Sequence, residues 1–134
     1  MANASDYLRN EIGTKYLNLG AGSSLPASLH VGAFTASLAA DGTNLGTEIS
    51  GSGYARASVS ASSFTESPNG TFTSNAQIAF PTASGSWGTI VSIGLFDAAT
   101  SGNLLVFDDL ASSAAVTTGI VLTIPASSLV VTIA

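Results

Sequence analysis

The sequence contains no cysteine, so disulfide bonds cannot stabilise the fold, and cysteine usage gives no information about the redox compartment. Charge is also scarce, because charged residues make up only 8% of the 134 residues, against about 25% in an average domain. Arg9, Lys15 and Arg56 are the only lysine or arginine residues, and the net charge is −5. Clustered basic residues are needed to neutralise nucleic-acid phosphates or to bind an anionic membrane, so we expect neither partner.

Long apolar runs are missing as well, since no stretch approaches the roughly 20 residues of a spanning helix. The first residues carry acids where a signal peptide needs an apolar stretch, so we expect no export by that route. The length favours one domain with a real core. Its surface must consist largely of Ser, Thr, Ala and Gly, which favours a protein packed against neighbours in an assembly. A small β-protein that tolerates such a coat is the alternative.

The N-terminal residues have the pattern of a short amphipathic helix. Ser5 or Asp6 can cap its start. Leu8, Ile12 and Tyr16 recur every four residues and therefore form one apolar stripe. Because the helix is short and contains a glycine, we expect this stripe to need a partner surface.

The rest of the chain alternates between β-rich runs and turn residues. About seven short strands with turns every 8–12 residues or so predict an antiparallel β-sandwich or jelly-roll-like domain. We therefore predict an all-β protein with a short N-terminal amphipathic helix. Its expected parts are an N-terminal helical arm (1–20), a Gly/Ser linker (21–28) and a β-sandwich domain (29–134).

Residues 86–110 contain the only tryptophan and are predicted to form a β-hairpin with its turn at residues 98–103. The first strand of this hairpin is apolar on both faces, which predicts a central strand covered on both sides. One face carries Val91, Ile93 and Leu95, and the other carries Ile90, Gly94 and Phe96. The large side chains are thus expected to fill a core.

Evidence for catalysis is weak in the sequence. His30 is the only imidazole, but serines are so common that a serine near it carries no information. Asp97 and Asp108 flank the hairpin and could approach the separation of a glycosidase carboxylate pair, although no aromatic subsite pattern accompanies them. Asp97 more simply closes the turn through nearby backbone N–H groups. We therefore predict no catalytic, cofactor or metal site.

Trp87 and Arg56 are the other residues with distinctive chemistry. Trp87 lies at a turn, where it could stack on a sugar or pack into the core, and packing is favoured because it buries a large ring. Arg56 shares a strand face with Tyr54, and we expect it to form an ion pair with Glu48 or Asp97.

The chain resembles a family of small tailed-bacteriophage virion proteins that are often labelled "phage tail fiber protein". The specific segments are "GTEISGSGYAR" (46–56) and "WGTIVSIGLFDAATSGNLL" (87–105). The resemblance extends over nearly the whole chain, from "SDYLRNEI" near the start to "IPASSLVVTI" near the end. Our structural and interface candidates from these segments and the helix are Leu8, Ile12, Tyr16, Tyr54, Arg56, Trp87, Phe96 and Asp97.

The resemblance implies a β-rich virion structural protein that catalyses no reaction and needs no cofactor. Some similar proteins coat the capsid as cement or decoration proteins, and others are assigned to the tail. Because one compact module without a shaft, coiled coil or repeat suits a shell, we favour a capsid decoration protein. Its expected partners are the major capsid protein and copies of itself, with a trimer favoured. It would be made in the host bacterial cytoplasm and lie on the capsid surface.

Two alternatives remain at this point. A tail-fibre or tail-tip protein would bind a host surface glycan through Trp87, Tyr54 and His30. An enzyme would depend on Asp97 and Asp108 to cleave a glycan.

Overall fold

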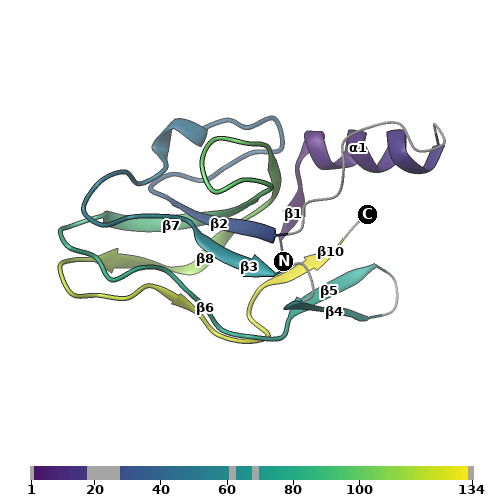
Figure 1. Ribbon diagram of the computed structural model, residues 1–134. Coiled ribbons are helices and arrows are strands. Elements are labelled where there is room, and N and C mark those ends of the chain that lie inside the picture. The colour runs from purple at the N-terminus through teal and green to yellow at the C-terminus, as the bar shows by residue number, and fades with distance from the viewer. Residues whose placement is uncertain (1, 18–27, 61–62, 68–69, 133–134) are drawn as a thin grey trace.

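A five-stranded antiparallel sheet with the order β1-β8-β7-β2-β3 organises the computed structural model, which describes residues 2–17, 28–60, 63–67 and 70–132 (Figure 1). The strands of this sheet are β1 (Asn3–Ala4), β2 (Ser28–Phe34), β3 (Ala57–Ser60), β7 (Gly88–Phe96) and β8 (Leu104–Val116). Two smaller sheets consist of β4 (Phe64–Ser67), β5 (Thr71–Ser74) and β10 (Val130–Thr132), and of β6 (Ile78–Ala79) with β9 (Thr123–Ile124). The helices are α1 (Asp6–Leu17) and the short 3₁₀ helix η1 (Leu45–Thr47).

Both faces of the five-stranded sheet are covered by apolar side chains. The main core joins one face to the strands of the two smaller sheets, and it contains Val31, Ile93, Leu95, Ile78, Ile124 and Val131. A second, smaller core of Phe34, Leu38, Phe96 and Leu104 covers the other face. The predicted all-β, sandwich-like fold with an N-terminal helix is confirmed, and so is the central strand covered on both sides.

The predicted hairpin is formed by β7 and β8, which pair in antiparallel register. A β-bulge between Ile90 and Ser92 shifts this register by disrupting the alternation of side chains. Ile90 therefore joins Ile93 and Leu95 in the main core, so the prediction that Ile90 shares a face with Phe96 is wrong. Ser92 lies on the other face, where its hydroxyl donates to the carbonyl oxygen of Ala36 at 2.7 Å.

A strand that the sequence did not predict precedes α1. β1 pairs with β8 through Asn3–Phe107 and Ala4–Val106, and Ala2 forms a parallel bridge to Val131 of β10. Two residues are too few to show the alternation by which a strand is predicted, so only the structure identifies β1. The division of the chain into arm, linker and domain stays a prediction, and residues 21–27 of the linker lie outside the described ranges.

Ser5 caps α1, so of the two capping residues predicted from the sequence, Ser5 and Asp6, the structure shows the first. Its hydroxyl oxygen accepts a hydrogen bond from the backbone N–H of Leu8 at 3.2 Å, and the hydroxyl donates to the carbonyl of Leu104. This residue therefore fixes the first turn of the helix to the start of β8. Among the described residues, no helix is long and apolar enough to cross a membrane.

Candidate functional site

Residues from the two distinctive sequence segments meet beside the central strand β2. Ala57 of β3 pairs with Val31, and Phe96 of β7 pairs with the adjacent His30. The residues just before β3 and at the end of β7 are thus brought together across β2. We call the resulting group the arginine cluster, and it consists of Glu48, Tyr54, Arg56, Phe96 and the carbonyl groups of Ala98 and Ser101.

Arg56 is held on every side within the arginine cluster. Its Nε and Nη2 groups each donate to one carboxylate oxygen of Glu48 at 2.7 Å, which is a bidentate ion pair. Its Nη1 group donates to the carbonyl oxygens of Ala98 at 2.9 Å and Ser101 at 2.7 Å. The guanidinium carbon lies 3.7 Å from the centroid of the Phe96 ring, a cation–π contact.

The charge of Arg56 is neutralised inside the protein, since its side chain is only 5% exposed and that of Glu48 only 21%. Four of the five N–H donors of the guanidinium are used, and one of its faces is covered by Phe96. The guanidinium of Arg56 therefore has only one N–H donor and one face left with which it could bind a ligand. The predicted ion pair of Arg56 is confirmed with Glu48, and Asp97 has a different role.

Tyr54 connects the arginine cluster to β2. Its hydroxyl donates to Oε1 of Glu48 at 2.8 Å and accepts from the backbone N–H of Ala33 at 3.0 Å. Burial, and then the neighbouring Glu48 carboxylate, raise the pKa of the Tyr54 phenol well above its usual value, so the phenol stays neutral.

Gly32 makes room for this arrangement, although sequence analysis did not single it out. A Cβ atom at Gly32 would lie 2.9 Å from Oε1 of Glu48 and 3.3 Å from the hydroxyl of Tyr54. A glycine inside a strand pattern is the sequence signal that could have indicated such a close approach.

Asp97 closes the turn between β7 and β8, as predicted. Its Oδ1 accepts from the backbone N–H of Asn103 at 2.8 Å, and its Oδ2 accepts from the Asn103 side-chain amide at 2.9 Å. Gly102 is left-handed, with φ +74°, and a Cβ atom there would lie 2.6 Å from Oδ1 of Asp97. Asp97 and Arg56 thus fix the same turn. Asp97 joins its two ends through Asn103, and Arg56 bonds to the carbonyl groups of Ala98 and Ser101 within it.

Trp87 packs into the main core and is only 4% exposed, which confirms the packing interpretation. Its indole N–H donates to the carbonyl oxygen of Ser52 at 3.0 Å. Its ring contacts Tyr54 edge-on, with centroids 5.3 Å apart, and also contacts Phe80. Trp87 is therefore not presented at the surface to stack on a sugar, as the glycan-binding alternative required.

The two carboxylates of the enzyme alternative are not brought together. Asp97 is hydrogen-bonded to Asn103, whereas Asp108 lies five residues beyond Asn103 on β8. At the rise of a strand, these five residues span about 17 Å. Paired glycosidase carboxylates lie within about 9.5 Å of each other.

His30 is on β2, in register with Phe96 and Ser58. Within the described ranges, no group of three or more His, Asp or Glu residues could hold a metal ion.

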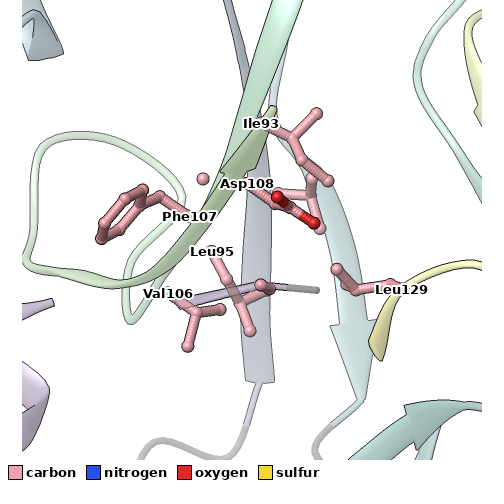
Figure 2. Close-up of a pocket in the computed structure, with 9 residues that line it drawn as sticks. Ile93, Leu95, Val106, Phe107, Asp108 and Leu129 are labelled. Atoms are coloured by element: carbon pink, nitrogen blue, oxygen red, sulfur yellow. The ribbon is translucent and has the colours of Figure 1, made fainter. Parts of the chain in front are cut away.

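A groove lies elsewhere on the protein, between β8 and the segment formed by β9 and the turn that precedes β10. Figure 2 shows where it begins: Ile93, Asp108 and Leu129 line a small cavity on one side of β8, and Phe107 points the other way. The same three residues also line a groove of about 470 Å³. The remaining residues of this groove, called the acidic groove below, are Asp109, Leu110, Ala111, Thr123, Ile124, Pro125 and Ser128.

Two residues of the predicted apolar stripe of the helix are half-buried within the chain. Leu8 is half-buried against the main core, and Ile12 is half-buried as well. The side chain of Tyr16 lies outside what the structure describes. Leu17, at the end of α1, is 87% exposed.

Comparison with known proteins gives one family. Residues 3–132 match the model of the family described as "Podophage GP4 fiber I protein gp80". No curated protein matches the chain. The match includes both distinctive segments and all residues of the arginine cluster.

Proposed function

The chain belongs to the family of the Podophage GP4 fiber I protein gp80, and from this premise we propose that it is a non-enzymatic subunit of a phage fibre. Membership in a phage fibre family makes it a structural protein of the virion. The finer assignment to a fibre follows the family description, which is closer to the tail-fibre alternative of the sequence analysis than to a capsid decoration protein.

The arginine cluster is the observation that carries a building-block function. The most distinctive polar residues of the chain bond to one another, and they fix the turn 97–103 against the loop that contains Glu48. A rigid loop surface suits contact with another protein, because little conformational entropy is lost when it binds. With Arg56 neutralised inside, the outer surface offers Ser, Thr and Ala contacts that require little desolvation of charge.

Capsid decoration is the second candidate, and the compact β-domain favours it. A fibre shaft is usually extended, whereas α1 has only 12 residues and no coiled-coil length. In either location, repeated copies would convert weak contacts into avid binding. The partners would be copies of this chain and a neighbouring virion protein.

Copy number in purified particles tests the proposal. Virions are purified to constant infectivity per protein mass, and the chain is quantified against the major capsid protein by mass spectrometry with labelled peptides. A few dozen copies or fewer support a fibre, and hundreds support the capsid candidate instead. Loss of the chain during purification would overturn the structural function in both forms.

A further inference from the structure

The chain before β9 continues the pairing of that strand with the segment around β6. The backbone N–H of Phe80 donates to the carbonyl oxygen of Leu122 at 2.9 Å, and the N–H of Ala83 donates to the carbonyl oxygen of Ile120 at 2.9 Å. Together with the register of β6 and β9, these bonds align residues 120–124 antiparallel to residues 78–83. We call residues 120–124 the edge segment, and in Figure 1 it runs in yellow-green beside β6.

The edge segment has main-chain groups that point away from β6. In an antiparallel ladder, successive residues turn their N–H and C=O groups to alternate sides of the strand. The carbonyls of Ile120 and Leu122 accept bonds from the neighbouring segment, so the N–H and C=O groups of Val121 and Thr123 point to the opposite side. Within the described ranges, no strand pairs with the edge segment on that side. An extended chain can therefore add there by main-chain hydrogen bonds.

The edge segment also lacks the features by which proteins protect exposed strand edges. Native edges usually carry charged residues or are covered, which prevents pairing with other chains. The edge strand β4 follows this pattern, because it contains Glu66. The edge segment is uncharged, and Ile120 and Val121 are each 44% exposed. An exposed, uncharged edge rich in β-branched residues is suited to pair with another strand.

The distribution of charge identifies a second copy of the chain as the source of that strand. All three basic and all eight acidic residues lie in residues 1–66 and 97–109, so residues 67–96 and 110–134 carry no charge. Two copies with a net charge of −5 each repel one another, and close contact between them costs least where both surfaces are uncharged. The edge segment and residues 78–83 both belong to the uncharged regions. A copy related by a two-fold axis offers the same main-chain groups in antiparallel order.

We propose that the edge segments of two copies pair antiparallel about a two-fold axis at Leu122. Val121 of one copy then lies opposite Thr123 of the other, and the outward N–H and C=O groups of both residues find partners. Pro125 has no N–H and ends the paired region. The β6–β9 sheets of the two copies join into one sheet, and the contact is isologous, so it closes as a dimer. The inference rests on the proposed function and deepens it by naming the surface that joins the subunits.

The acidic groove borders this contact. Thr123 and Ile124 point to opposite faces of β9 and yet both line the groove, so the groove lies beside the edge of the strand. Asp108 and Asp109 line it as well, and pairing brings these acids of the two copies closer together. Salt screens the resulting repulsion, so the dimer is expected to become more stable as the ionic strength rises.

Charge variants of the edge segment test this contact in the full-length protein. Sedimentation velocity over a range of concentrations measures self-association of the wild type, of Val121→Lys/Thr123→Lys and of Val121→Asp/Thr123→Asp. Each double variant is expected to raise the apparent Kd about tenfold or more, because like charges meet across the two-fold axis. An equimolar mixture of the two variants, one of them fluorescently labelled, is expected to associate at least as tightly as the wild type, because lysine then faces aspartate. This pattern requires that the same segment of both copies forms the contact.

Thr65→Lys/Ser67→Lys provides the matched control. Thr65 and Ser67 are exposed and have the same spacing on the edge strand β4. The control changes the net charge by the same amount as Val121→Lys/Thr123→Lys and should not weaken association. Circular dichroism verifies that each variant is folded.

Hydrogen exchange of the wild type tests the pairing without any substitution. The backbone N–H groups of Val121 and Thr123 are expected to exchange more slowly as the protein concentration rises. A wild type that stays monomeric, double variants without effect, a mixture that does not associate, or exchange at Val121 and Thr123 that is independent of concentration would each overturn the inference. The proposed function fails separately, through absence of the chain from purified virions.

Discussion

Replacing Arg56 by methionine should be among the most destabilising substitutions in the chain. The change leaves the Glu48 carboxylate with little exposure and no cation, and it removes four hydrogen bonds. Breaking a buried ion pair in this way costs about 3 to 5 kcal/mol. The entropy of unfolding of 134 residues is roughly 0.28 kcal/mol/K, so Tm should fall by roughly 11 to 18 °C. Thermal and urea denaturation followed by circular dichroism at low protein concentration measure both quantities.

Two further variants separate the ion pair from general effects of the substitution. Arg9→Met makes the same change at the exposed Arg9–Asp6 pair and should cost no more than about 0.5 kcal/mol. Arg56→Met combined with Glu48→Leu leaves no unpaired charge and should be more stable than Arg56→Met alone. If Arg56→Met costs less than about 1 kcal/mol, or if the double variant is no more stable than Arg56→Met alone, the cluster does not have the energetic role described.

Three other substitutions test single contacts of the fold. Gly102→Ala forces a left-handed alanine against Asp97 and should cost about 2 kcal/mol or more, measured by urea denaturation. Gly13→Ala, with no atom within 4 Å of the new Cβ, should instead stabilise the protein by up to about 1 kcal/mol. A stability change of the same sign for both substitutions would show that the left-handed backbone of Gly102 does not decide the difference. Because burial raises the pKa of Tyr54 above the value of about 10 that it has in the unfolded chain, its stabilising contribution is complete below about pH 10 and is lost as the pH rises from there toward the folded pKa. Tyr54→Phe should therefore reduce the alkaline loss of stability, and an unchanged pH profile would refute this.

Sequence patterns predicted the features that depend on local alternation and large rings. The hairpin of β7 and β8, its buried central strand and the burial of Trp87 follow from apolar residues on both faces of residues 89–96. The Asp97 turn follows from the ordinary chemistry of aspartate beside glycine.

Features that depend on contacts distant in sequence could not be predicted in the same way. β1 is recognised only through its pairing with β8, about one hundred residues away. The bulge that turns Ile90 to the main core depends on the partner strand. From the sequence, Glu48 and Asp97 are equal candidates to pair with Arg56, and only the folded structure distinguishes them, because Glu48 bonds to Arg56 and Asp97 bonds to Asn103. The acidic groove combines side chains of three strands and a loop, so no single segment indicates it.

Electron cryomicroscopy of the intact virion would show whether this chain is a building block of a fibre. We expect density for this β-domain in repeated copies within a fibre, with the arginine cluster inside each copy and not in contact with a substrate. The contrary result would be a particle without this density, or a domain whose Arg56 and Glu48 have separated around a bound ligand.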